Sequence, residues 1–313
     1  MIKNIIRISL LGLVFIGATL VIIYGVSLGT KSKLDASERS NIGGQYITVD
    51  DGVISYNVSG PSNGEPVILV HGLSTPKFVW NATTAALSAA RYRVYSFDHL
   101  GRGFSDRPKT EYNRTFYVRE LQQLLDGLSL TAPVTLVGYS MGGANIIHYT
   151  NAFPERVKEL ILIAPAGFIP IDKNLKRFIE LPLIADALSP ILIKRYALAG
   201  IEKHVTTGAA PASMITDFER QYAYADYSQA ILSTLRHYKM SGLDEEYAAV
   251  GELGIKVSAL WGTEDKVVPF AASAKVQKLI PQLQLYPFDG ADHSIAFAQA
   301  DQVNQQLLAI LAQ

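Results

Sequence analysis

After residue 44, the apolar positions of the chain follow two alternating patterns. Short continuous apolar runs predict strands, and stretches with apolar residues three and four positions apart predict helices. Their regular alternation is typical of a mostly parallel sheet with helices on both faces. The first two strands should form a hairpin that turns at Asp51-Gly52. We expect strands near 45–50, 54–59, 67–70, 93–98, 134–139, 159–164, 257–261 and 283–287, and helices over 78–90, 113–128 and 142–152 and from residues 269 and 295.

One region, from about residue 167 to residue 254, interrupts this alternation. It has helical apolar spacing and several prolines, and it contains no convincing strand. The region predicts a helical cap over 167–254, inserted into a core that spans 45–166 and 255–313. We expect most of its tyrosines to pack within the helices and one or two to face a substrate pocket: Tyr196, Tyr222, Tyr224, Tyr227, Tyr238 and Tyr247.

The first 30 residues form a separate segment. Residues 8–30 carry no charge and are mostly apolar, and a membrane span needs only about 20 such residues. A cleaved signal peptide has a shorter apolar core, of about 7–15 residues, and a small-x-small cleavage site, which Val26-Ser27-Leu28 matches poorly. We therefore expect residues 1–30 to be a membrane anchor and 31–44 a polar linker, with a cleaved signal peptide and a buried helix as alternatives. An anchor would place the catalytic domain on the extracytoplasmic side, whereas cleavage would release a secreted protein.

Composition narrows the possible functions. The 313 residues suit one large α/β domain with an insertion. Because 28 basic residues balance 28 acidic ones, we expect no nucleic-acid partner. The chain has no cysteine, which excludes disulfides, thiolate metal sites and cysteine nucleophiles. We expect neither a metal nor an organic cofactor, and the sequence does not determine an oligomeric state.

The strongest chemical motif is Gly138-Tyr139-Ser140-Met141-Gly142, which follows an apolar strand and precedes a helix. Gly-x-Ser-x-Gly in this setting is a nucleophile elbow, a sharp turn that exposes the serine hydroxyl above the sheet. The glycines leave room because a Cβ at either position would collide with neighbouring backbone. The helix N-terminus favours the negative charge that develops beside the serine. We expect Ser140 to be the nucleophile.

Two later strand ends supply candidate partners for Ser140. Asp265 lies in an acidic loop after one strand, and its neighbour Glu264 is the rival for the same role. His293 follows the last strand and would remove the Ser140 proton and return it to the leaving group. The chain order Ser140, Asp265, His293 is that of an α/β-hydrolase triad. The competing histidines are expected to pack, to lie in turns or to lack an acid partner: His71, His99, His148, His204 and His237.

With these motifs, residues 45–312 resemble the α/β-hydrolase fold family, of the capped serine esterase and monoacylglycerol-lipase-like kind. The resemblance also rests on His71-Gly72-Leu73 and on Asp98-His99-Leu100-Gly101-Arg102-Gly103-Phe104-Ser105-Asp106, which follow two further strands. It implies a mostly parallel sheet with helices on both faces and an inserted cap. It also implies that the backbone amides of Leu73 and Met141 form the oxyanion hole, which adds about 3–4 kcal/mol of barrier lowering per donor. His71, Asp98 and Arg102 would hold their turns.

The sequence departs from the family's common pattern at one position. The residue before the catalytic histidine is usually glycine, and here it is Asp292. We expect a solvated loop residue, with a hydrogen bond to the loop or a modest rise of the His293 pKa as alternatives.

A serine nucleophile suits acyl transfer to water, whereas epoxide hydrolases and haloalkane dehalogenases of this fold use aspartate. We expect hydrolysis of carboxylic esters, with a small hydrophobic or lipid-like ester captured at the membrane as substrate. Two alternatives stay open. One is a C–C bond hydrolase that acts on a diketone-type substrate with the same triad, and the other is a non-catalytic member that binds a ligand through its cap.

Overall fold

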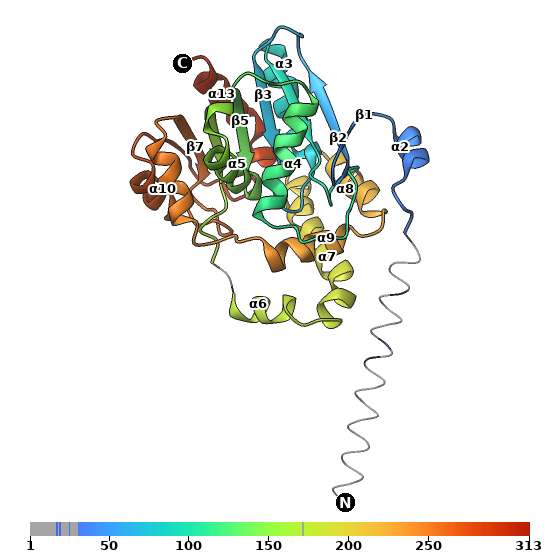
Figure 1. Ribbon diagram of the computed structural model, residues 1–313. Coiled ribbons are helices and arrows are strands. Elements are labelled where there is room, and N and C mark those ends of the chain that lie inside the picture. The colour runs from blue at the N-terminus through green and yellow to red at the C-terminus, as the bar shows by residue number, and fades with distance from the viewer. Residues whose placement is uncertain (1–16, 18, 20–24, 26–30, 171) are drawn as a thin grey trace, which may run out of the picture.

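The computed structural model describes residues 17, 19, 25, 31–170 and 172–313. Its centre is an eight-stranded sheet in the order β1-β2-β4-β3-β5-β6-β7-β8 (Figure 1). The hairpin β1–β2 and the pair β2–β4 are antiparallel, and all other neighbours are parallel, so the predicted fold class is confirmed. The strands are β1 Gln45–Val49, β2 Gly52–Ser59, β3 Pro66–Val70, β4 Arg93–Phe97, β5 Val134–Tyr139, β6 Val157–Ile163, β7 Lys256–Gly262 and β8 Gln284–Phe288.

Burial and turn geometry explain where the strands lie. Every residue of β5 is buried, as expected for the middle of a parallel sheet that is covered on both faces. The first hairpin turns one residue earlier than predicted, because Gly52 already pairs with Val49. Gly52 has a φ of +143°, which glycine adopts readily and other residues rarely do.

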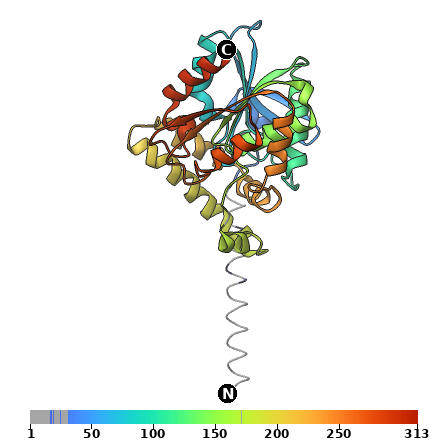
Figure 2. The same ribbon diagram turned by 90° about the vertical axis from the view of Figure 1, so that its left-hand side faces the viewer.

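Helices cover both faces of the sheet, as Figure 2 shows from the side. One layer contains η1 (Lys77–Trp80), α3 (Asn81–Ala89), α12 (Ile295–Ala298) and α13 (Ala300–Leu311). The other contains α4 (Arg114–Gly127), α5 (Met141–Ala152), α10 (Asp244–Glu252) and α11 (Ala272–Leu279), and η2 (Pro154–Arg156) connects α5 to β6. The predicted helix over 78–90 is therefore a short 3₁₀ turn followed by an α-helix.

Between β6 and β7 the described residues form further helices beyond one end of the sheet (Figure 1). These are α6 (Lys173–Ile179), α7 (Ile184–Thr206), α8 (Ser213–Tyr222) and α9 (Tyr227–His237), followed by α10. The chain enters and leaves this region side by side, since Gly167 N–H donates to Met240 O at 3.0 Å and Leu243 N–H to Gly167 O at 3.2 Å. Because α10 packs on α5 and α11, we use "cap" below for α6–α9, and the predicted division at 167–254 stays a prediction.

The stretch predicted to be a linker packs against the body. It contains the short helix α2 (Ala36–Ile42), and we call residues 31–42 the N-terminal strap. The Lys31 ammonium lies 3.4 Å from the centroid of the Tyr222 ring in α8, and Arg39 forms an ion pair with Asp106 after β4. Burial, followed by the positive charge of nearby arginine and lysine, lowers the pKa of Lys31 to about 8. The strap therefore contacts both the cap and the core.

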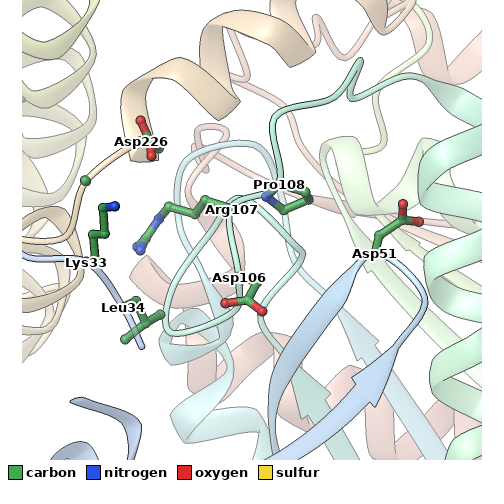
Figure 3. A pocket seen from close by; sticks show the side chains of 8 residues that line it. Lys33, Leu34, Asp51, Asp106, Arg107, Pro108 and Asp226 are labelled. Carbon is green, nitrogen blue, oxygen red and sulfur yellow. The ribbon is translucent and has the colours of Figure 1, made fainter. Parts of the chain in front are cut away.

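A cavity of about 260 Å³ lies between the strap, the β1–β2 turn and the cap (Figure 3). One wall is held by Ser32, whose carbonyl accepts a hydrogen bond from Ala225 N–H at 2.9 Å. Burial lowers the pKa of Arg107 to about 10. The lining combines both charges: Lys33, Leu34, Asp51, Asp106, Arg107, Pro108, Ala225 and Asp226.

The prediction of a membrane anchor needs correction. No helix in the part of the chain that the structure describes is long and apolar enough to cross a bilayer. Segment 1–30 itself lies outside the described residues, apart from Gly17, Thr19 and Gly25. An uncharged apolar run of spanning length is necessary for a membrane helix but does not by itself make one. The membrane partner and the extracytoplasmic location deduced from it are withdrawn.

Replacing Arg39 by methionine should lower the free energy of unfolding by about 1 kcal/mol, because the ion pair with Asp106 is mostly buried. The matched control is Lys158→Met, which removes an ion pair with Glu65 whose side chains are about half exposed and which should cost almost nothing. Urea denaturation of the full-length variants measures both. Equal stability of the two variants would show that the ion pair between Arg39 and Asp106 contributes nothing to stability.

Candidate active site

The turn between β5 and α5 holds Ser140 in a backbone conformation that side-chain-bearing residues rarely adopt. Its φ is +54° and its ψ is −119°, which costs on the order of 1–3 kcal/mol. Hydrogen bonds on both sides maintain it, since Ser140 N–H donates to Ile163 O at 2.9 Å and Ala166 N–H donates to Ser140 O at 2.8 Å. The side chain is nearly buried, with 9% of the residue exposed. The geometry is that of the predicted nucleophile elbow.

Two glycines make this turn possible by allowing close backbone approach. A Cβ on Gly138 would lie 2.6 Å from the carbonyl oxygen of Gly142. A Cβ on Gly142 would overlap the carbonyl oxygen of Val70 and lie 2.6 Å from that of His71. The start of α5 is therefore packed directly under the end of β3.

The three residues predicted as a triad lie in hydrogen-bond contact. His293 Nε2 lies 3.0 Å from Ser140 Oγ, and His293 Nδ1 lies 2.8 Å from Asp265 Oδ2. The other carboxylate oxygen of Asp265 accepts the amides of Val267 and Val268, both at 2.8 Å. A carboxylate held in this way keeps the proton on Nδ1 and leaves Nε2 free to accept from the serine hydroxyl.

Tyr139 supports the histidine and was not expected from the sequence. Its hydroxyl donates to the backbone carbonyl of His293 at 3.0 Å, and the two rings lie 5.3 Å apart. The residue is buried, and burial raises the pKa of its phenol, so the group stays a donor. A tyrosine at the first variable position of the Gly-x-Ser motif was the only local signal.

Leu73 lies in the loop after β3 and follows Gly72, where an added Cβ would lie 3.2 Å from Ser140 Cβ, and Met141 directly follows Ser140 and opens α5. Neither of their amides donates to a protein acceptor among the residues that the structure describes. The Leu73 carbonyl accepts from Arg102 Nε at 2.8 Å, and Arg102 also reaches Thr234 of α9 at 2.7 Å. The fully buried Arg102 guanidinium thus holds the Leu73 loop and ties it to the cap.

His71 maintains the same loop as a neutral ring. Its Nδ1 lies 2.7 Å from Gly72 O, and its Nε2 accepts from His99 N–H at 2.9 Å. Burial, together with the nearby His99, lowers the pKa of His71 well below its ordinary value. His71 therefore has both ring nitrogens occupied and is not available as a base.

A family model of the alpha/beta hydrolase fold matches residues 65–298, more than half of the chain. The chain belongs to the alpha/beta hydrolase fold family.

This alpha/beta hydrolase is similar to known proteins over most of its length. It is 28% identical over 264 residues to an uncharacterized protein of Mycobacterium tuberculosis, and the alignment covers 80% of this chain and 75% of the relative. It is 26% identical over 281 residues to the 2-hydroxy-6-oxo-6-phenylhexa-2,4-dienoate hydrolase of Burkholderia cepacia, which covers 86% and 96%. The crystal structure of the enol-lactonase from Burkholderia xenovorans has a TM-score of 0.70 at 20% identity and covers 86% of this chain and 100% of that one, which shows a shared fold.

The rival residues of this hydrolase lie elsewhere. Glu264 is exposed. His99 contacts Glu120 in the core, and burial lowers the pKa of His99 to about 3. Burial also lowers the pKa of His148, which packs against Tyr238, to about 4. None of these side chains contacts Ser140.

The sequence offered no acid partner for either of the two cap histidines, and the structure places a carboxylate near each of them. His237 Nδ1 lies 4.0 Å from Glu111 Oε1, and His204 Nε2 lies 3.2 Å from Asp292 Oδ2. Glu111 and Asp292 lie far from these histidines in the sequence, so no local sequence pattern predicted the two contacts. Within the described residues, no group of three or more potential ligand side chains is arranged to hold a metal ion.

Asp292, which stands where the family usually has glycine, has protein partners as well as contact with solvent. Its Oδ1 accepts the amide of Ser294 at 2.9 Å, so it does hydrogen-bond the loop, and its Oδ2 lies 2.6 Å from Lys203 Nζ. Burial opposes the charged form, but the hydrogen bonds from Lys203 and Ser294 and the field of His204 outweigh it and lower the pKa of Asp292. The side chain therefore carries its charge at neutral pH.

Gly142→Ala should lower the free energy of unfolding by about 2–3 kcal/mol or more, because the new methyl group overlaps backbone carbonyls that cannot move independently. Gly200→Ala is the matched control. It lies in α7, where an added methyl group would meet no atom within 4 Å, and it should be neutral or stabilising by up to about 1 kcal/mol. Chemical denaturation followed by circular dichroism compares them. Similar stabilities would mean that the elbow tolerates a side chain.

Proposed function

We propose that the protein is a serine esterase that cleaves carboxylic esters with a hydrophobic or lipid-like acyl or alcohol group, of the capped monoacylglycerol-lipase-like kind. The observation that carries this proposal is the line of contacts from Ser140 Oγ through the His293 imidazole to the Asp265 carboxylate. These side chains come from the ends of three separate strands and meet at the elbow. Such an arrangement activates a serine hydroxyl for attack on a carbonyl carbon.

The reaction follows from these positions. His293 Nε2 takes the hydroxyl proton as Ser140 Oγ bonds to the ester carbonyl carbon, and the amides of Leu73 and Met141 receive the oxyanion. The tetrahedral intermediate collapses, the C–O bond to the alcohol breaks, and His293 gives its proton to the departing oxygen. Water then attacks the acyl-Ser140 carbonyl with His293 again as the base, which releases the acid and restores the hydroxyl.

The cap supports the choice of a hydrophobic substrate. It exposes large apolar side chains along α6, α7 and the connection between them, in a region that lies beyond one end of the sheet (Figure 1). Such side chains favour contact with apolar surface. The residues are Leu175, Leu181, Leu183, Ile184, Ile191, Leu192 and Tyr196.

A second candidate is hydrolysis of a C–C bond. It is favoured by the similarity to the Burkholderia cepacia enzyme, whose name describes a hydrolase of a phenylhexadienoate with oxo and hydroxy groups. The same serine, base and oxyanion amides would serve that reaction, so the substrate has to decide between them.

The deciding experiment compares full-length wild type with Ser140→Ala on short-chain and long-chain p-nitrophenyl esters and on a vinylogous diketone. We expect ester turnover that favours the longer chains, and a loss of at least about 10³-fold in kcat in the variant. Turnover of the diketone alone would support the C–C alternative. A wild-type protein that is folded but does not react with a fluorophosphonate probe would indicate a non-catalytic binder.

Asp265→Asn should lower kcat by about 10⁴-fold, because an amide cannot hold the proton on His293 Nδ1 in the productive tautomer. Glu264→Gln removes a neighbouring exposed carboxylate and should change kcat by less than about twofold. Steady-state kinetics on the best ester measures both variants. Comparable losses would mean that the orienting acid has been assigned wrongly.

A further inference from the structure

The last turn of the cap helix α7 contacts the loop that carries His293. Lys203 Nζ lies 2.6 Å and His204 Nε2 lies 3.2 Å from the same carboxylate oxygen of Asp292. Asp292 directly precedes His293 in the chain. The cap therefore contacts the candidate base through a single intervening residue.

The contact has a buried part and an exposed part. Lys203 is exposed over 65% of its side chain, whereas Asp292 is exposed over 27%. His204 is buried, and its ring packs edge-on against Phe297 of α12 at 5.7 Å between centroids. Since α12 follows the His293 loop, His204 contacts this segment on both sides of the histidine.

The second carboxylate oxygen of Asp292 links the end of α7 to the backbone that follows His293. It accepts the amide of Ser294 at 2.9 Å, so the carboxylate bridges the backbone just after His293 to the end of α7. A displacement of α7 would pull on this bridge or break it.

Besides Ser140, two groups contact His293 itself, and a third contact reaches the residues on either side of it. Tyr139 in the elbow binds its carbonyl, and Asp265 after β7 binds its imidazole. Both of these belong to the sheet core, whereas the Asp292 contact comes from the cap. Among the described residues, the cap is the one part outside the core that contacts a residue next to His293.

We propose that Asp292 is a positioning residue through which the C-terminal end of α7 sets the orientation of His293, so that Ser140 is fully activated only while α7 is packed in place. The inference rests on the proposed function, because it assigns His293 the role of base. It extends that function by coupling the cap to the catalytic base in addition to the substrate. Cap opening during substrate entry would then leave the serine less reactive until the cap returns.

The experiment is a double-mutant cycle of Asp292→Asn and Lys203→Met in the full-length protein. The asparagine can still accept the Ser294 amide but lacks the charge that pairs with Lys203 and His204. Lys203 is exposed, so its replacement should leave the fold intact. The matched control is Lys194→Met, the same change on the same helix, which removes a 3.5 Å pair with the exposed Glu219 and a contact 5.5 Å from the centroid of the Tyr222 ring, neither of which involves Asp292.

We expect each single variant to lower kcat and the rate of fluorophosphonate labelling by about tenfold, with KM unchanged within about twofold. The double variant should be no slower than the slower single variant, because both changes remove one shared contact. Lys194→Met should match wild type. The low-field proton signal of His293 Nδ1 should shift in Asp292→Asn and Lys203→Met alone.

Wild-type rates and an unshifted signal in both single variants would overturn the inference, and so would independent, multiplicative losses in the double variant. Failure of the proposed function looks different. In that case wild type itself is neither labelled nor active on esters, and the proton signal still reports whether α7 orients His293.

Discussion

The structure depends on one close approach, that of the first turn of α5 to the end of β3. Gly142 lies so close under the carbonyl groups of Val70 and His71 that no side chain fits. This contact allows the sharp turn at Ser140 with its positive φ, which local sequence preference alone would not produce. The buried strand β5 and the hydrogen bonds of Ser140 to Ile163 and Ala166 offset the strain. The position of the hydroxyl, and with it the whole site, follows from backbone packing in the core.

Of the histidines near this turn, His293 is the one whose ring is free to act as a base toward Ser140. His71 and His99 are buried and neutral, and their ring nitrogens are occupied by backbone or side-chain partners. The Asp265 carboxylate, in contrast, is held by two amides and by His293. A polar network in which each member has a partner is rigid, and rigidity keeps the imidazole aligned with the serine.

The sequence predicted the parts that depend on local pattern. Strand and helix periods located the sheet, and the glycine spacing located the elbow, because both are set by residues a few positions apart. The contacts of Tyr139 with His293 and of Lys203 with Asp292 join residues that are far apart in the chain. The spacing of residues in the sequence therefore could not predict them. Residues 31–44 were expected to be a linker because they are polar, yet charged groups within residues 31–42 pack on the body. Hydropathy likewise suggested a membrane span for 1–30, which no described helix supports.

The side-by-side entry and exit of the cap at Gly167 and Leu243 bears on how such a protein can be altered. When the two ends of an inserted region lie side by side, the rest of the fold loses little entropy in closing the chain around it. The region between the two ends can therefore be exchanged as one module. The contact of Lys203 with Asp292 limits that freedom. A transplanted cap would need to present a cation at the same place, or the host would need a neutral residue before its histidine. Grafting experiments that change substrate range would therefore have to treat position 292 as part of the cap.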